Sequence, residues 1–132
     1  MLFRSPAAVG VALADRDRGV SRAVIGLIGD GSSQYSVQAL WTAAQHKLPI
    51  VYVVMRNNEY SILKSFAVLE ETPGVPGLDL PGLGIAALAR GWGCRAVDVE
   101  TTGELEQEFK TALDADTTTV IVVRTQPQQA ML

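Results

Sequence analysis

Cysteine, histidine and long apolar runs are scarce in this chain of 132 residues. Cys94 is its only cysteine, so no internal disulfide can form, and we expect the protein to be located in a reducing cytoplasm. No apolar run reaches the roughly 18 residues that a membrane-spanning helix needs, so we expect no membrane partner. A basic stripe with interleaved aromatic residues is also missing, which argues against nucleic acid as a partner.

The only cysteine and the only histidine are both poorly placed for catalysis. Cys94 comes at the start of an expected strand, and no histidine is placed to activate its thiol, so we expect a small buried apolar side chain. His46 comes at the end of an expected helix, just before Pro49, where a surface or capping role is favoured. We therefore predict no catalytic residue in this chain.

The chain is long enough for one domain with a hydrophobic core. Apolar residues make up 48% of it, and the net charge is −3, with both signs dispersed along the sequence. A domain of this size buries about two-thirds of the surface that its unfolded chain exposes. We therefore expect residues 1–132 to form a single domain.

Helical and strand patterns alternate along the sequence. Helices are predicted at residues 6–14, 35–47, 60–70, 83–90 and 103–114, and strands at 22–28, 50–55, 95–99 and 118–124. This alternation predicts an α/β fold, a three-layer sandwich with a mostly parallel sheet of about four to five strands. The strand at 22–28 is expected to be buried, and the charged run at 15–19 is expected to be solvated surface.

Finer expectations concern the helices. The inward side chains are predicted to be Val37, Leu40, Trp41 and Ala44 in the helix at 35–47, and Leu105, Phe109 and Leu113 in the helix at 103–114. Gly91 is expected to end the helix at 83–90.

Two polar motifs follow two apolar runs. The segment Gly29-Asp30-Gly31-Ser32-Ser33 follows the first expected strand, and Asn57 follows the second. Adjacent parallel strands would place Asp30 and Asn57 side by side, as hard oxygen ligands that suit Mg²⁺ or Ca²⁺. The glycines and the helix that follows leave backbone N–H groups free for a phosphate. The pattern therefore predicts a divalent ion bound to a diphosphate.

The motif differs from two common phosphate-binding motifs. The glycine spacing is not that of the dinucleotide-binding fingerprint, and no Gly-Lys-Ser or Gly-Lys-Thr follows, so it is not a P-loop. A single aspartate after a strand is often only a helix cap, which remains the alternative for Asp30.

Together these residues resemble the diphosphate-binding motif of thiamine diphosphate enzymes. The resemblance extends over about residues 3–123 and is carried by three segments, which read GDGSSQYSVQALWTAAQHK from Gly29, MRNNEY from Met55 and VPGLDLPG from Val75. Within this family the segments are similar to the benzoylformate decarboxylases in particular.

The resemblance implies a set of ligands for thiamine diphosphate and Mg²⁺. The metal ligands would be the side chains of Asp30 and Asn57 and the backbone carbonyl of Glu59. The residues implied to bind the cofactor are Gly29, Asp30, Gly31, Ser32, Ser33, Tyr35, Asn57, Tyr60, Ile62 and Leu63. Plain packing remains the alternative for the two tyrosines. For Ile62, Leu63 and the nearby Phe66, expected on the substrate side, the alternative is a place in the core.

Two departures from the family pattern concern the backbone. Asn58 stands where relatives often have glycine, and asparagine tolerates a positive φ better than most residues, so we expect the turn to survive. Gly84 stands where relatives often have an aspartate that caps the next helix, and glycine is itself a tolerable cap.

Much of the family's active site has no counterpart in this sequence. The resemblance implies a site between this domain and a pyrimidine-binding domain of another subunit, with the activating glutamate and the catalytic histidines outside this chain. The hydrophobic residue that bends the cofactor would fall at or near Met1. We therefore expect either a fragment of a longer enzyme or an excised module.

The expected function is the thiamine-diphosphate- and magnesium-binding domain of a 2-oxoacid decarboxylase of the benzoylformate decarboxylase type, inactive alone. Its expected partners are a pyrimidine-binding domain or further copies of the chain. The alternatives are an acetolactate synthase-like carboligase domain and a non-catalytic binding or oligomerisation module.

Overall fold

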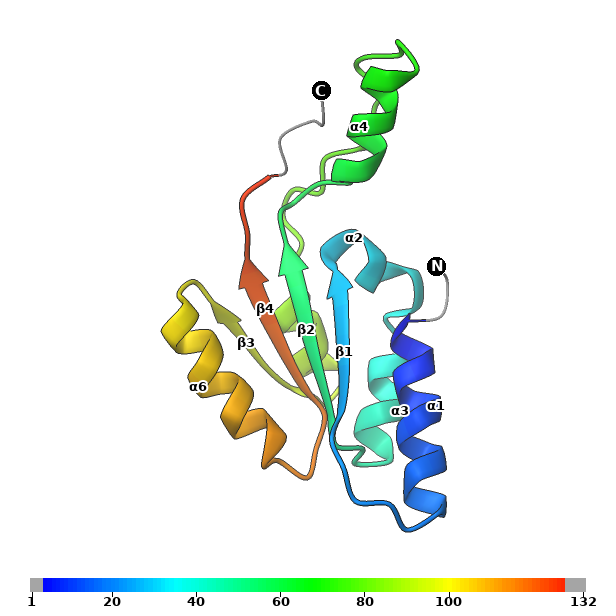
Figure 1. Ribbon diagram of the computed structural model, residues 1–132, viewed down its shortest axis with the longest axis vertical. Helices are drawn as coiled ribbons and strands as arrows, with labels where there is room; N and C mark the ends of the chain where they lie inside the picture. The colour runs from blue at the N-terminus through cyan, green and yellow to red at the C-terminus, as the bar shows by residue number, and fades with distance from the viewer. Residues whose placement is uncertain (1–3, 128–132) are drawn as a thin grey trace.

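Four parallel strands form the central sheet of the computed structural model, which describes residues 4–127 (Figure 1). The strands are β1 (Val24–Gly29), β2 (Ile50–Arg56), β3 (Arg95–Val99) and β4 (Thr119–Arg124). They lie in the order β1-β2-β4-β3, so the last strand enters between β2 and β3. All three pairings are parallel, which confirms the predicted parallel sheet.

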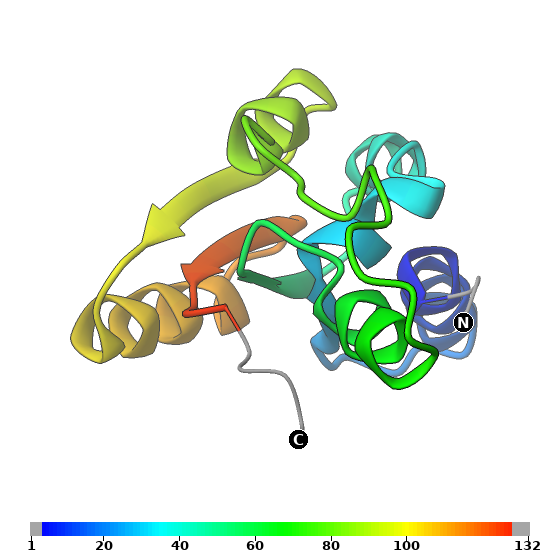
Figure 2. The same ribbon diagram turned by 90° about the horizontal axis from the view of Figure 1, so that it is seen from above.

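Helices cover both faces of this sheet. They are α1 (Arg4–Asp17), α2 (Asp30–Ser33), the 3₁₀ turn η1 (Gln34–Ser36), α3 (Ala39–Gln45), α4 (Ser61–Leu69), α5 (Ile85–Gly91) and α6 (Thr102–Leu113). The larger core lies between the sheet and α1, α3 and α5, and a smaller one lies under α6 (Figure 2). The predicted three-layer α/β sandwich is therefore confirmed.

The central strand β2 is buried along nearly its whole length because side chains cover it on both faces. Tyr52 is fully buried, and its hydroxyl donates to the backbone carbonyl of Ser5 at 2.8 Å. Gly26 is the pairing partner of Tyr52 on β1, and a Cβ at Gly26 would lie 2.7 Å from the tyrosine ring. The glycine in this strand therefore makes room for the buried ring.

The expectation that the first strand is buried is wrong. β1 is an edge strand, and Ile25 and Leu27 are 55% and 63% exposed. They lie on the sheet face that α6 covers, but α6 packs over the other strands and leaves β1 open on that side (Figure 1). The apolar sequence was typical of a strand covered on both faces, whereas only one face of β1 is covered in this chain.

The predicted helix at 35–47 is interrupted. The chain forms the short α2, then η1 and a turn, and only then α3, which buries Ala39, Leu40 and Ala43. Trp41 is exposed, so the predicted inward face is wrong at this residue. The 3₁₀ turn changes the rotation per residue, which shifts the face that meets the sheet.

Smaller corrections concern the ends and faces of other elements. Gly91 is the last residue of α5 rather than its terminator, and Gly93, with φ +89°, takes the left-handed conformation two residues later. Leu105 and Phe109 pack against the smaller core as predicted, whereas Leu113 is exposed. Cys94 is buried just before β3, and His46 is the exposed C-cap of α3, both as expected.

One member of the charged run at 15–19 is not solvated. Asp15 is buried at the end of α1, where its carboxylate accepts two hydrogen bonds from the Arg22 guanidinium, at 2.7 and 3.0 Å. A fork-to-fork pair of this kind allows a carboxylate to leave water. The charge pattern alone did not distinguish this residue from its exposed neighbours.

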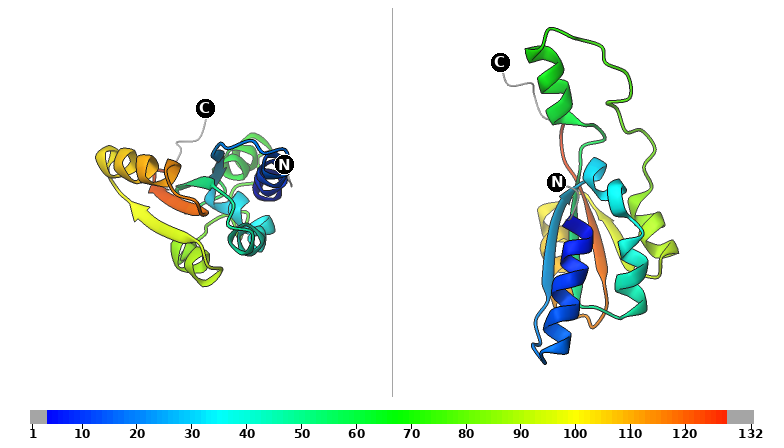
Figure 3. Two further views of the ribbon diagram at one scale, coloured as in Figure 1. Left: turned by 90° about the horizontal axis from the view of Figure 1, so that it is seen from below. Right: turned by 90° about the vertical axis from the view of Figure 1, so that its right-hand side faces the viewer.

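Helix α4 stands beyond the carboxyl ends of the strands, together with the loop that follows it (Figure 3). Its apolar side chains Ile62, Leu63, Phe66, Val68 and Leu69 are all exposed. No helix within residues 4–127 is long and apolar enough to cross a membrane. The position predicted for the cofactor-bending residue, at Met1, lies outside the described residues.

Candidate functional site

The carboxyl ends of β1 and β2 bring Asp30 to the turn that contains Asn57. Gly29 pairs with Met55, so Asp30 follows the end of one strand while Asn57 follows the end of its neighbour. Asp30 is buried, and its two carboxylate oxygens accept the backbone N–H groups of Gly31 at 2.8 Å and of Asn58 at 2.7 Å. The side chain therefore links the two strand ends.

Asp30 is not the N-cap of the helix that it begins. The N-cap of α2 is Gly29, and it forms no side-chain capping bond. The Asp30 carboxylate instead bonds to its own neighbour and to a residue 28 positions away. A simple helix cap, which was the alternative for this aspartate, does not describe this arrangement.

The Asn57 amide is held by the turn and by the start of α4. Its Nδ2 group donates to the hydroxyl of Ser61, and its Oδ1 accepts the backbone N–H of Glu59 at 3.2 Å. The turn passes through Asn58, whose φ of +61° lies in the left-handed region, as expected from the sequence. The amide oxygen keeps a second lone pair, which is available to a metal ion.

The Glu59 side chain is committed to α4. Its carboxylate accepts hydrogen bonds from the Ser61 hydroxyl at 2.9 Å and from the Lys64 ammonium at 2.6 Å, and the bond from Lys64 lowers the pKa of Glu59. Within residues 4–127 no hydrogen bond ends on the backbone carbonyl oxygen of Glu59. The carbonyl, which was the predicted ligand, is therefore the group of this residue that can accept an ion.

Gly31 is a position where only glycine fits. A Cβ at this residue would lie 2.3 Å from Cε1 of Tyr60, which is shorter than real contacts allow. The tyrosine ring therefore rests directly against the backbone of the first turn of α2. Tyr60 is also the N-cap residue of α4, so this contact joins the two polar motifs.

The remaining predicted cofactor-binding residues differ in their exposure to solvent. Ser33 is buried, and its hydroxyl donates to the carbonyl of Asp30 at 2.6 Å, while Ser32 is partly exposed. Tyr35 is 60% exposed, so plain packing does not describe it in this chain. Ile62 and Leu63 on α4 are also exposed, so the alternative that they belong to the core is wrong.

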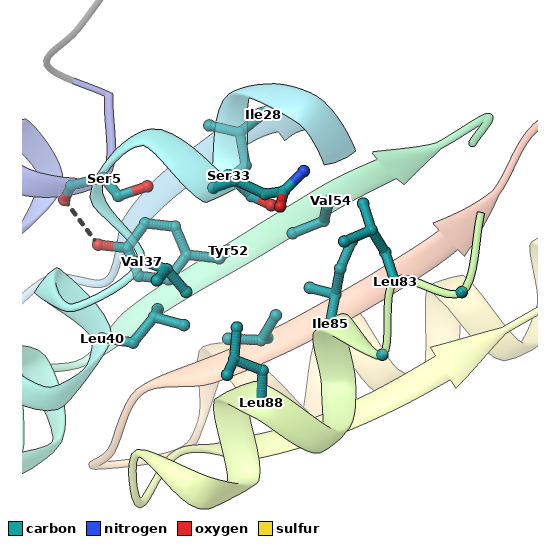
Figure 4. A pocket seen from close by; sticks show the side chains of 14 residues that line it. Ser5, Ile28, Ser33, Val37, Leu40, Tyr52, Val54, Leu83, Ile85 and Leu88 are labelled. Atoms are coloured by element: carbon teal, nitrogen blue, oxygen red, sulfur yellow. Dashed lines mark hydrogen bonds between the residues drawn. The ribbon is translucent and has the colours of Figure 1, made fainter. Parts of the chain in front are cut away.

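An apolar cavity of about 250 Å³ lies beneath α2, on the face of the sheet that carries α3 and α5 (Figure 4). Its walls include Val37, Leu40, Val54, Ile85 and Leu88. Ser33 is the one predicted site residue in its lining, and neither Asp30 nor Asn58 lines the cavity. It was not predicted, because its walls come from segments far apart in the sequence.

The residues present fit a hard divalent cation with a diphosphate. One carboxylate, one amide oxygen and one free backbone carbonyl are the oxygen ligands that Mg²⁺ accepts, and Mg²⁺ keeps other positions for water and phosphate. In the described part of the chain, no three side chains of His, Cys, Asp or Glu gather at one place. The predicted magnesium ligands are not a cluster of this type, because Asp30 is the only one of them that would bind through a carboxylate.

Comparison with protein families identifies the class to which this domain belongs. Residues 1–123 match the model described as thiamine pyrophosphate enzyme, C-terminal TPP binding domain, and thiamine pyrophosphate is another name for thiamine diphosphate. The chain belongs to this family. The resemblance stated from its Gly-Asp-Gly and Asn motifs is therefore confirmed.

Individual relatives are similar over most of this chain. It is 48% identical over 124 residues to benzoylformate decarboxylase of Pseudomonas aeruginosa, covering 94% of this chain and 23% of that protein. It is 31% identical over 115 residues to the acetolactate synthase large subunit of Buchnera aphidicola subsp. Schlechtendalia chinensis, covering 86% and 19%. A crystal structure of benzoylformate decarboxylase from Polynucleobacter necessarius superposes with a TM-score of 0.93 at 49% identity, covering 97% and 24%. The chain thus spans about a quarter of the length of such decarboxylases.

Proposed function

We propose that residues 1–132 form the domain that binds Mg²⁺ and the diphosphate of thiamine diphosphate in a 2-oxoacid decarboxylase of the benzoylformate decarboxylase type. The observation that carries this proposal is the position of the buried Asp30 carboxylate, bonded across to the Asn58 N–H at the neighbouring strand end. It stands beside an asparagine amide and a free carbonyl, in a chain that belongs to the family.

Each group has a proposed role in holding the cofactor. Asp30 and the amide oxygen of Asn57 would bind Mg²⁺ together with the carbonyl of Glu59. Backbone N–H groups in the first turn of α2, at Ser32 and Ser33, would face the diphosphate, because the first N–H groups of a helix have no intrahelical partner. Tyr35, Tyr60, Ile62 and Leu63 would line the rest of the cofactor and the substrate side.

The chain's own residues hold and orient, and none is placed to move a proton. Bound thiamine diphosphate would supply an electron sink for the loss of CO₂ from a 2-oxoacid. Neither Cys94 nor His46 lies at the proposed site, since one is buried before β3 and the other caps α3. We therefore expect the isolated chain to be inactive with benzoylformate until a pyrimidine-binding domain, from another chain or subunit, completes the site.

A carboligase of the acetolactate synthase type remains the second candidate, because the chain is 31% identical to such a subunit. A non-catalytic module that has kept the fold is the third. Binding of the cofactor distinguishes this module from both enzymes, and the product formed by the completed site distinguishes the two enzymes from one another.

Calorimetry with thiamine diphosphate and Mg²⁺ tests the proposed site. Wild type should bind weakly. Asp30→Asn should bind more weakly still, because the new amide keeps an oxygen ligand but loses the charge, and Asp30→Ala, which keeps neither, should not bind. His46→Ala is the control and should bind like wild type. If Asp30→Ala binds as well as wild type, the assignment is wrong, and turnover of benzoylformate above a heat-inactivated control would disprove the expected inactivity.

A further inference from the structure

Lys64 is the only charged residue of helix α4. Its ammonium group contacts two carboxylates, that of Glu59 at 2.6 Å and that of Asp79 at 2.5 Å. Glu59 belongs to the turn that carries the proposed metal ligands, and Asp79 belongs to the loop after α4. One side chain therefore connects three segments at the edge of the proposed site.

These contacts continue as far as the Asn57 side chain. The Ser61 hydroxyl accepts a hydrogen bond from the Asn57 amide and donates one to the Glu59 carboxylate at 2.9 Å. Lys64 holds the other oxygen of that carboxylate. The network therefore runs without a gap from Lys64 through Glu59 and Ser61 to the side chain proposed to bind the ion.

Backbone pairing reinforces the same connection. Glu59 and Asp79 face each other in an isolated antiparallel bridge. The Tyr60 N–H donates to the carbonyl of Leu78 at 2.8 Å, and the Leu80 N–H donates to the carbonyl of Asn58, also at 2.8 Å. Lys64 lies across this bridge and joins the side chains of its two paired residues.

The pair with Glu59 differs from an ordinary surface ion pair. The Glu59 side chain is only 10% exposed, so loss of its cation would leave a carboxylate largely removed from water. The bond from Lys64 is also the main cause that lowers the pKa of Glu59, and the bond to Asp79 is the main cause that raises the pKa of Lys64. Asp79 itself is mostly exposed, so its pair contributes less.

We propose that Lys64 is a positioning residue for the ion site, which fixes the turn from Asn57 to Tyr60 by joining Glu59 to Asp79. It would not touch the metal ion or the cofactor. Residues that hydrogen-bond to metal ligands, without contacting the ion, orient those ligands. Their loss lowers metal affinity by roughly 10- to 100-fold in other proteins. This inference rests on the proposed function of Asp30, Asn57 and Glu59.

The binding test compares Lys64→Met with wild type in calorimetry with thiamine diphosphate and Mg²⁺. We expect affinity to fall by roughly tenfold or more, and Lys64→Arg to restore most of it, because the arginine keeps the charge. The control is Lys110→Met, which removes a lysine from an exposed ion pair with Glu106 on α6 and should change nothing. Equal affinity of wild type and Lys64→Met would overturn the proposal.

A second measurement needs no cofactor. The amide protons of Asn58 and Tyr60 are bonded to the Asp30 carboxylate and to the Leu78 carbonyl, so their exchange with solvent reports on the turn. Exchange should accelerate at both residues in Lys64→Met and remain unchanged in Lys110→Met. If both amides stay equally protected in Lys64→Met, Lys64 does not position the turn.

The two measurements separate the inference from the function on which it rests. Absence of binding by wild type would disprove the proposed cofactor site, and Lys64 would then have no ion site to position. Binding by wild type with an unaffected Lys64→Met would disprove only the role of Lys64. A loss of affinity in Lys64→Met that disappears when Glu59→Gln is already present would support the route through Glu59.

Discussion

The carboxylate of Asp30 accepts the backbone N–H of Asn58 at 2.7 Å and so connects the carboxyl ends of two adjacent strands. The same carboxylate accepts the N–H of Gly31 at 2.8 Å. Two backbone donors thus depend on one buried side chain. A residue proposed to bind the ion therefore also stabilises the fold in which the ion would bind.

This double role predicts that Asp30→Ala destabilises the protein even without cofactor. Two backbone N–H groups would lose their acceptor, so the free energy of unfolding should fall by about 2–3 kcal/mol, as measured by urea denaturation. Asp30→Asn keeps one acceptor oxygen and should lose about half as much. The control Asp17→Ala, at an exposed position at the end of α1, should stay within about 0.5 kcal/mol of wild type. Equal stability of Asp30→Ala and wild type would show that the two donors find other partners.

Gly31→Ala should destabilise the protein through the contact with Tyr60. The new Cβ would lie 2.3 Å from the ring, so the tyrosine has to move, at a cost of about 1–3 kcal/mol. The double variant Gly31→Ala/Tyr60→Ala should recover part of that loss. The same substitution at Gly103 in α6, where the new Cβ would meet nothing within 4 Å beyond its own helix turn, should instead stabilise the protein by about 0.5–1 kcal/mol. Equal unfolding midpoints for the two alanine variants would contradict this prediction.

The thiol of Cys94 should be inert in the folded protein. Burial raises the pKa of Cys94 to about 11, and the thiol donates to the carbonyl of Leu40 at 3.5 Å. At pH 8 about one thiol in a thousand would then be ionised, compared with about a quarter in an unfolded chain. Labelling with a thiol-specific chromogenic disulfide should therefore be slow in buffer and fast in denaturant. Rapid labelling of native protein would mean that the thiol is accessible.

Glu104 should make the free energy of unfolding depend on pH in the acidic range. Its carboxylate accepts the N–H groups of Glu100 and Thr101 in the capping box of α6, and these bonds lower the pKa of Glu104 from its ordinary value of 4.5. Because the folded-state pKa is the lower one, the stabilisation is fully present above pH 4.5 and is lost as the pH falls through the folded-state pKa. The stability difference between wild type and Glu104→Gln should thus shrink on acidification below pH 4.5. Urea denaturation at a series of pH values measures it, with Glu106→Gln, which keeps the cap intact, as the control.

Helix α4 should mediate self-association of the isolated chain. Its exposed apolar side chains form a surface of a kind that rarely stays uncovered. We expect a dimer or larger oligomer at micromolar concentration by light scattering, and a monomer for Phe66→Glu/Leu69→Glu. Val20→Glu, at another exposed apolar position, is the control and should associate like wild type. A strict monomer at high concentration would refute this prediction.

Local patterns predicted what depends on local geometry. The strand Arg95–Val99 has the predicted bounds, and Asn58 takes the positive φ expected of it. What depends on distant segments was not predictable. The exposure of Ile25 and Leu27 depends on which helix covers β1, and the pair between Lys64 and Asp79 depends on a loop that returns over 15 residues. The single charged residue of α4, Lys64, was the only local signal for that network.

The insertion of β4 between β2 and β3 also constrains when the sheet can be completed during synthesis. A ribosome makes β2 and β3 first, and within residues 4–127 β3 pairs only with β4. Until residues 119–124 leave the exit tunnel, β2 has an open edge and β3 has no neighbour in the sheet. The nascent chain must therefore keep the buried strand β2 from pairing elsewhere until β4 has been translated and has left the tunnel.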